Sequence, residues 1–399
     1  MDLTLPADVE AVRLRAKRFV DEVLLPAEAD PASFGEGENV RLDLLEDLRA
    51  QAKARGLWCP QMPQERGGQG LPTIGMAAVY EELGRSRFGP VACNCAAPDD
   101  GNMLVLEKVG TPEQKTCWLQ PIVDGKVRSS IVMTEPAPGS GSDPAGMMLT
   151  RAEKRNDRYV VSGRKWFITG AEGAAHFILL ARTSDDPRRG LTAMLFHKDQ
   201  PGWRVLRRIP IMGPEEHGGH CEVELDGLEV PFGAVLLEEG LGMKVTQIRL
   251  GIARLTHCMR WLGMARRALE IADPYVRERR AFGQRLAEKE SVQGMLGEAA
   301  MAIEIGRLLT MRAAAKIDAG DKAQKEVSMA KIQVADALHR AVDTAIQLLG
   351  AKGYSKDTPL EWMYRYARQA RLVDGASEVH RMVVARELLR DVGGFFAWP

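Results

Sequence analysis

The chain has 399 residues, which is long enough for two or three domains and a large hydrophobic core. Its 54 lysines and arginines balance 54 aspartates and glutamates, so the net charge gives no general attraction to nucleic acid or to anionic membranes. No apolar run approaches the ~20 residues that span a bilayer, and the start Met1-Asp2-Leu3-Thr4 does not resemble a signal peptide. We therefore expect no nucleic-acid partner, no membrane insertion and a cytosolic location.

The six cysteines do not show the spacing of a secreted disulfide framework, so we expect free thiols. Two groups of potential metal ligands lie close together in the sequence. One is Cys93 with Cys95, and the other is His217, His220 and Cys221. Neither is followed by a second pair at zinc-like spacing, and we expect no metal site.

Helices are predicted for the first third of the chain. Apolar residues recur at near-helical spacing from Val9 to Val23, before Pro26, and again from Leu42 to Ala52. A further helix is expected over 74–83. The glycine-rich stretch at 66–72 is expected to be a loop rather than a nucleotide-binding fingerprint, because no strand precedes it.

The central region changes from helical to strand periodicity at about Ile131. Short β-rich segments are predicted at 159–161, 177–180, 191–196 and 221–225. Expected turns follow at Asn156-Asp157, Asp185-Asp186 and Asp226-Gly227. Helical spacing then returns, with an apolar stripe from Val245 to Leu262 and long helices at 292–317 and 327–349. The expected domains are 1–128, 129–235 and 236–399.

Two short segments in the central region carry the clearest functional pattern. They are Met133-Thr134-Glu135-Pro136 and Trp166-Phe167-Ile168-Thr169, and a loop of small residues at 139–143 lies between them. Backbone amides and hydroxyls in such a loop can reach a flat polar ligand, although a glycine-serine loop alone is more often a plain surface turn.

The ordered set resembles the flavin-binding signature of the acyl-CoA dehydrogenase family. The resemblance implies an α+β multidomain fold, with an N-terminal helical domain, a central β-barrel-like domain and a C-terminal four-helix bundle. It also implies FAD as cofactor, held here by Met133, Thr134, Ser142, Phe167 and Thr169. The loop is about two residues longer than is usual in the family, which leaves open which serine contacts flavin or substrate. Phe167 stands where relatives have tryptophan.

Two later segments resemble parts of the family that contact FAD, and the arginine of the first reaches the FAD of a neighbouring subunit. Arg279 and Phe282 match an Arg-x-x-Phe-Gly segment that contacts the FAD pyrophosphate, and Gln347 with Gly350 matches a segment near the adenosine. The resemblance therefore implies a homo-oligomer, either a dimer or a tetramer. A family His-Gln pair is replaced by Lys289-Glu290, so that contact is not expected.

Asp374 occupies the position of the family's catalytic glutamate, in Val373-Asp374-Gly375-Ala376-Ser377. Judged alone, an Asp-Gly pair before a helix is more often a turn and cap. Some relatives carry the base on another helix, but Ala253 fills that position here. By resemblance, Asp374 removes the α proton of an acyl-CoA thioester while the β hydride passes to flavin N5. Arg254 and Gly375 are expected to support the substrate or the base loop.

Aspartate at this position, with Thr256-His257-Cys258-Met259-Arg260, resembles the branch of vertebrate family members ten and eleven. That branch is associated with 4-hydroxyacyl-CoA catabolism, and Asn94 and Asp99 would suit an oxygenated acyl chain. Capping of a helix by Asp99 or Asp100 is the alternative. The expected electron acceptor is electron-transfer flavoprotein. A nitroalkane-oxidase-like enzyme and a non-catalytic flavin or acyl-CoA binding protein are the competing functions.

Overall fold

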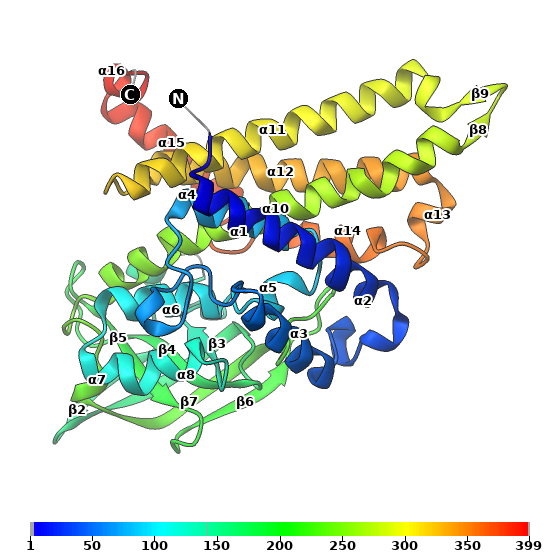
Figure 1. The fold of residues 1–399 in the computed structure, drawn as a ribbon. Coiled ribbons are helices and arrows are strands. Elements are labelled where there is room, and N and C mark those ends of the chain that lie inside the picture. Colours follow the sequence, from blue (N-terminus) through cyan, green and yellow to red (C-terminus); the bar gives the residue numbers. More distant parts are fainter. Residues whose placement is uncertain (1–3, 142, 398–399) are drawn as a thin grey trace.

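The computed structural model describes residues 4–141 and 143–397. Helices come first in the chain, a sheet follows, and helices return, which confirms the expected order (Figure 1). The N-terminal helices are α1 (Ala7–Phe19), α2 (Leu25–Ala29), α3 (Leu42–Ala54), α4 (Thr73–Leu83), α5 (Gly89–Ala92), α6 (Asp99–Val109), α7 (Pro112–Gln114) and α8 (Gln120–Val123).

The first helical segment, expected from the spacing of Val9 to Val23, continues past Pro26. A π-helical turn at Val20–Leu24 joins α1 directly to α2, and Pro26 lies in the first turn of α2. A proline is tolerated there because the first amides of a helix have no partner within it.

The central part is a mixed seven-stranded sheet with one short helix, α9 (Pro144–Met147). Six strands follow the order β1-β4-β2-β3-β7-β6, and β5 pairs with β4. Strand β1 lies parallel to β4, whereas β3 lies antiparallel to both β2 and β7. The strands are β1 (Arg128–Val132), β2 (Arg151–Arg155), β3 (Arg158–Thr169), β4 (Ala174–Arg182), β5 (Leu191–His197), β6 (Trp203–Arg208) and β7 (His220–Pro231).

The turn expected at Asp226-Gly227 is wrong, because β7 continues through it. Val161 pairs with Leu228 and Ser162 pairs with Asp226, so Gly227 is the extra residue of a β-bulge. Its φ of 76° is a left-handed conformation that glycine adopts readily. Strands β2 and β6 each carry three arginine or lysine side chains and were not expected from the sequence.

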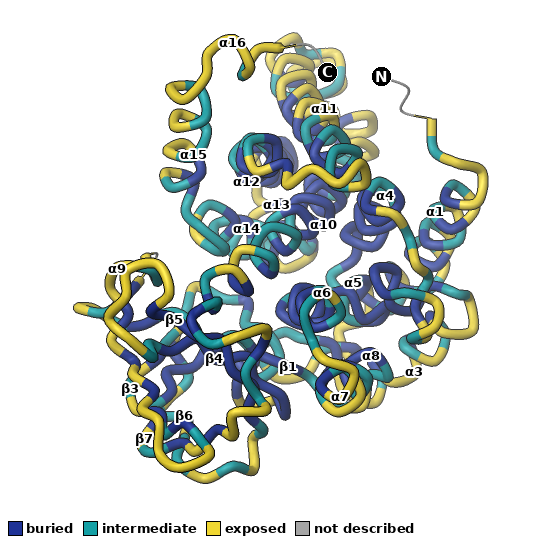
Figure 2. Tube along the Cα trace, turned by 90° about the vertical axis from the view of Figure 1, so that its left-hand side faces the viewer, coloured by how far each residue is buried: buried dark blue, intermediate teal, exposed yellow. Residues whose placement is uncertain are grey.

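The C-terminal part is built around α10 (Gly242–Glu278), which packs against α4, α6, α11, α12 and the sheet strand β5. Helix α12 also packs against α11 and α15, which gives the expected bundle of four helices. Figure 2 shows α10 buried in the middle of the molecule, whereas α15 lies at its surface. The remaining elements are β8 (Arg280–Ala281), β9 (Gln284–Arg285), α11 (Glu290–Asp318), α12 (Gln324–Leu349), α13 (Ala351–Tyr354), α14 (Leu360–Gln369), α15 (Ser377–Arg390) and α16 (Val392–Phe395).

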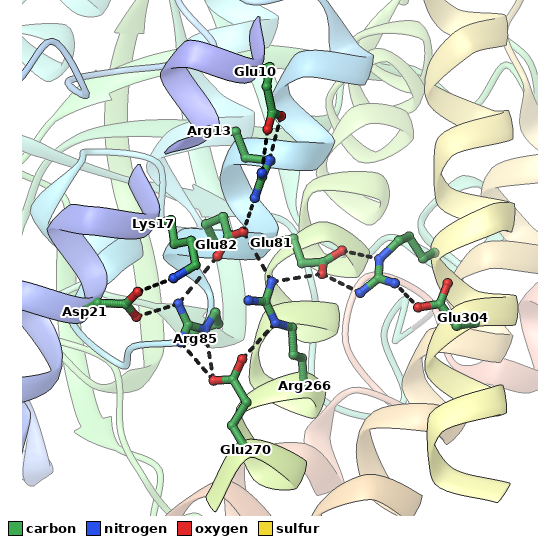
Figure 3. A network of polar contacts seen from close by, with 11 residues as sticks. Glu10, Arg13, Lys17, Asp21, Glu81, Glu82, Arg85, Arg266, Glu270 and Glu304 are labelled. Atoms are coloured by element: carbon green, nitrogen blue, oxygen red, sulfur yellow. Dashed lines mark hydrogen bonds and ion pairs between the residues drawn. The ribbon is translucent and has the colours of Figure 1, made fainter. Parts of the chain in front are cut away.

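Apolar and polar contacts both join the N-terminal helices to the bundle. One apolar cluster contains Phe19 and Tyr80 from the N-terminal helices together with Leu255 and Met259 of α10. Beside it, Glu82 of α4 accepts contacts from Arg13 of α1, Arg266 of α10 and Arg85 of the turn after α4 (Figure 3). The helical parts therefore form one packed unit rather than two independent layers.

None of the described helices is long and apolar enough to cross a membrane. All six cysteines lie in the described part of the chain and are free thiols, as expected. Within residues 4–141 and 143–397, no cluster of three or more histidine, cysteine and acidic side chains is arranged to hold a metal ion.

Candidate active site

Asp374 lies in the short loop between α14 and α15, and the half-buried Arg254 and the fully buried Lys331 hold this loop in place. Nε of Arg254 donates to the backbone oxygen of Asp374 at 2.7 Å. Nζ of Lys331 donates to the backbone oxygens of Ala370 at 2.6 Å and Gly375 at 3.1 Å. Asp374 and Gly375 have φ values of 52° and 99°, a left-handed pair that these contacts stabilise.

The carboxylate of Asp374 faces α10 and is largely buried, with 17% of the side chain exposed. Oδ1 lies 3.5 Å from Nη1 of Arg249, and Oδ2 lies 3.3 Å from Nε2 of His257. Oδ2 is buried and makes no hydrogen bond. Burial raises the pKa of Asp374, but His257, Arg249 and Arg254 outweigh it and hold the pKa well below its ordinary value. The group is therefore an ionised carboxylate with a free oxygen, which is what a base requires.

A chain of hydrogen bonds connects this carboxylate to the sheet. Nε of Arg249 donates to Oδ1 of Asn102 at 3.3 Å, and Nδ2 of Asn102 donates to Oγ of Ser129 at 3.0 Å. Ser129 lies on β1, which leads directly into Met133 and Thr134. The base loop and the first signature segment are thus linked through α10, α6 and β1.

The two signature segments lie side by side and share a buried lysine. The backbone amide of Trp166 donates to the backbone oxygen of Thr134 at 3.0 Å. Nζ of the fully buried Lys165 donates to the backbone oxygen of Met133 at 2.8 Å and to Glu135 Oε1 at 3.1 Å. Glu135 also accepts from the amides of three residues of the following loop, at positions 140, 149 and 150. Lys165 and Glu135 therefore fix the course of this loop.

Several side chains around these segments fit a flat polar cofactor. Phe167 stands at a bulge of β3 with a φ of 51° and is 45% exposed. Oγ of Ser140 is buried without a hydrogen-bond partner. Oγ1 of Thr169 lies 3.1 Å from Nδ1 of His220, and a hydroxyl can make a further hydrogen bond. Ser142 lies outside the described residues.

Three family models match the chain in succession. They are the acyl-CoA dehydrogenase N-terminal domain over residues 6–126, the middle domain over 130–228 and the C-terminal domain over 240–389. The chain belongs to the acyl-CoA dehydrogenase family. Members of this family are FAD-dependent oxidoreductases that act on CH–CH groups.

Relatives of different total length match within this family. The chain is 38% identical to acyl-CoA dehydrogenase family member 11 of Gallus gallus, over 96% of this chain and 50% of that protein. It is also 38% identical to "Probable acyl-CoA dehydrogenase FadE2" of Mycobacterium tuberculosis, over 100% of this chain and 99% of that protein. The solved butyryl-CoA dehydrogenase of Megasphaera elsdenii is similar with a TM-score of 0.86 and 28% identity, over 98% of this chain and 100% of that one. The chain thus spans about half the length of the Gallus gallus relative.

The residues of the two later segments expected to contact FAD lie far from Asp374. Arg279 ends α10, and Phe282 is 97% exposed at the tip of the β8–β9 hairpin (Figure 1). Gln347 and Gly350 are exposed near the end of α12. Arg254 and Arg279 are separated by roughly 37 Å along α10 at 1.5 Å per residue. A side chain at the C-terminal end of α10 therefore lies far from a group bound beside Arg254 in the same chain.

Asn94 and Asp99 have protein partners for their polar groups. Nδ2 of Asn94 donates to the backbone oxygen of Ile122 at 2.9 Å. Asp99 accepts from the amide and hydroxyl of Ser129 at 2.6 and 2.7 Å and pairs with Arg128. Neither Asp99 nor Asp100 caps α6, whose N-cap is Pro98. A substrate contact for Asn94 or Asp99 therefore stays a prediction.

Sequence reasoning missed three nitrogen-bearing side chains around Asp374, namely Arg249, His257 and Lys331. Arg249, Arg254, His257 and Arg260 recur at steps of three to five residues in α10, a spacing that places them on neighbouring turns of one side. This polar row within an otherwise apolar helix was the available signal. Nothing comparable identified Lys331, because a lysine in a long helix is usually exposed.

Proposed function

We propose that the chain is an FAD-dependent acyl-CoA dehydrogenase that converts an acyl-CoA thioester to its 2-enoyl-CoA, with Asp374 as base. The observation that carries the proposal is the state of Asp374: an ionised, buried carboxylate whose Oδ2 accepts no hydrogen bond. A carboxylate in this state can take a proton from carbon without first losing another partner.

The proposed step begins with the α C–H bond of the substrate. The proton passes to Oδ2 of Asp374, and the electron pair of that bond becomes part of the new Cα–Cβ double bond as a hydride leaves the β carbon. FAD, when bound, supplies the acceptor for that hydride. Arg254 and Lys331 keep the backbone of the base loop in place during proton transfer.

The cofactor is proposed to be held by two sets of residues. Met133, Thr134, Phe167 and Thr169 would hold the flavin end of the FAD of this chain, together with Ser140 or Ser142. Arg279, Phe282, Gln347 and Gly350 would contact the FAD of a second copy, because α10 separates them from Asp374. A guanidinium such as that of Arg279 suits the pyrophosphate as a bidentate donor. The enzyme is accordingly proposed to be at least a dimer, which sedimentation of the FAD-loaded protein can test.

The acyl chain is proposed to carry an oxygen. The polar cluster at Asn94 and Asp99 is satisfied internally, so the support comes from elsewhere. A cavity of about 80 Å³ is lined by Arg260, by aromatic residues that include Trp261 and Tyr366, and by His257, which also contacts Asp374. The guanidinium of Arg260 next to aromatic surface suits a hydroxylated chain better than a plain one. A cytosolic location and electron-transfer flavoprotein as the acceptor complete the proposal.

Turnover of FAD-loaded protein with plain and 4-hydroxylated acyl-CoAs of several lengths tests this function. We expect 2-enoyl-CoA as the product, reduction of an added electron acceptor, and higher kcat/KM with an oxygenated chain. Hydrogen peroxide release with a nitroalkane, without turnover of any acyl-CoA, would contradict the proposal in favour of an oxidase.

A further inference from the structure

Behind Asp374, a continuous row of polar side chains leads away from the candidate active site into the protein interior. Nε2 of His257 lies 3.3 Å from Oδ2 of Asp374, and Nδ1 of His257 lies 3.4 Å from Nη2 of Arg260. Nη1 of Arg260 lies 2.5 Å from Oδ2 of Asp100. Asp100 is fully buried, and Arg260 is 6% exposed. The row therefore joins the base on the α14–α15 loop to α10 and α6.

The inner members of this row are fixed by further contacts. Asp100 Oδ2 accepts from the Thr256 hydroxyl at 2.7 Å, and Asp100 Oδ1 accepts from the amide of Gly101 at 2.7 Å. Nη1 of Arg260 also donates to the backbone oxygen of Cys95 at 2.7 Å. Burial opposes the charge on Asp100, but Arg260 outweighs it and lowers the pKa of this carboxyl. Asp100 and Arg260 are thus a rigid ion pair.

The chemistry of Arg260 determines where the proton of His257 resides. A guanidinium can only donate hydrogen bonds, so Nδ1 of His257 must accept from it. The proton of the neutral imidazole is then on Nε2, which faces the carboxylate of Asp374. The His257 ring is also stacked on Trp261, with centroids 4.9 Å apart, which limits its rotation.

We propose that His257 is a positioning residue for Asp374: it directs an Nε2–H at Oδ2, and Arg260 and Asp100 fix its tautomer and orientation. This inference rests on the proposed function. The Oδ2 contact at 3.3 Å falls short of a hydrogen bond in the free protein, and such contacts commonly tighten when substrate binds. Once one lone pair of Oδ2 is occupied by His257, the other is directed to the substrate.

Other groups keep Asp374 ionised, so orientation is the distinct contribution of His257. Arg249 and Arg254 face Asp374 from α10, Lys331 from α12 and His380 from α15. Loss of His257 raises the pKa of Asp374, and because the carboxylate is the active form, the acid limb of the rate moves to higher pH. Arg249, Arg254 and Lys331 still favour the carboxylate in such a variant, and the pH profile separates this movement from a loss of rate at the plateau. A large fall in rate at neutral pH would therefore reflect misplacement, which can cost about 100-fold per ångström.

The first test compares two variants of the FAD-loaded enzyme by anaerobic flavin reduction across acyl-CoA concentrations. His257→Phe keeps a ring against Trp261 but removes both nitrogens, and His257→Gln keeps an N–H donor. We expect the limiting rate constant to fall about 10- to 100-fold in His257→Phe with little change in substrate affinity. His257→Gln should recover most of the loss. The matched control is His339→Phe, a half-buried histidine beside Tyr364 in the bundle, which should leave the rate unchanged.

The second test reads the tautomer directly, by ¹⁵N NMR of protein labelled at its seven histidines. The signal lost in His257→Phe identifies His257, and we expect an Nε2–H imidazole at neutral pH. An Nδ1–H tautomer would overturn the inference. A His257→Phe enzyme as fast as the wild type, or a His257→Gln enzyme as slow as His257→Phe, would also overturn it. If no acyl-CoA reduces the wild-type flavin, the proposed function fails, whereas the tautomer measurement still decides this arrangement.

Discussion

At the residue scale, a left-handed backbone marks many of the residues that the sequence had singled out. Asn94, Phe167, Phe282 and Asp374 all have φ between 51° and 53°, although none is glycine. Non-glycine residues in this region carry strain that the surrounding contacts must hold, and such strain gathers at functional sites. Resemblance to a family could identify these positions, but sequence pattern alone could not show their backbone conformation.

Lys165 is the residue whose loss we expect to disturb the two signature segments most. It is fully buried between Met133, Glu135 and Leu180. Lys165→Met leaves Glu135 as a buried charge without its cation, and we expect a loss of about 3–5 kcal/mol in the free energy of unfolding. The double variant Lys165→Met/Glu135→Gln should recover part of it. Urea unfolding at pH 7 measures both, and a single variant within about 1 kcal/mol of the wild type would contradict this role.

The difference in the free energy of unfolding between wild type and Lys165→Met should depend on pH. Burial lowers the pKa of Lys165 to about 8, although Glu135 partly offsets the effect. The unfolded chain, with a lysine pKa of about 10.4, therefore binds more protons between about pH 8 and 10. Lys165 makes the wild type gain stability with rising pH across that window, and Lys165→Met should lack that gain.

At the element scale, the sequence predicted α10 as a helix with an apolar stripe, and it missed the polar row on the same helix. The apolar stripe is a repeating signal that packing requires. The polar row with Arg249, His257 and Arg260 has meaning only beside Asp374 and Asp100, which come from distant parts of the chain. Long-range pairing of this kind leaves no local pattern, so a single sequence does not identify it.

A substitution of Glu82 tests how strongly contacts between the N-terminal helices and α10 stabilise the protein. The Glu82 side chain is 2% exposed and contacts Arg13 of α1 at 2.6 Å, Arg266 of α10 at 3.2 Å and Arg85 at 3.5 Å (Figure 3). Glu82→Gln leaves three arginines without their shared carboxylate, and we expect a loss of about 3–5 kcal/mol.

The matched control is Glu10→Gln. Glu10 forms an ion pair with Arg13 at the solvent-exposed edge of this network, and its side chain is 37% exposed. Solvent screens that pair, so its loss should cost no more than about 1 kcal/mol. Equal effects of the two variants on chemical denaturation would show that the buried network does not join the helices as we propose.

At the scale of the whole molecule, the order of helices, sheet and helices followed from periodicity alone. The flavin segments followed from the order of several short motifs. The pairing of distant strands did not follow from the sequence, because β1 pairs with β4 in parallel and β3 pairs with β7, which no local signal specifies. The separation of Asp374 from Arg279 by the length of α10 likewise became apparent only once α10 was known to be continuous.

The most direct measurement of the central claim is anaerobic flavin reduction by the best acyl-CoA in wild type and Asp374→Asn. The asparagine keeps the shape of the side chain but cannot accept the α proton. We predict that flavin is reduced about 10²- to 10⁴-fold more slowly in the variant, while acyl-CoA still binds. Equally fast reduction in Asp374→Asn, or a wild-type flavin that no acyl-CoA reduces, would contradict the account.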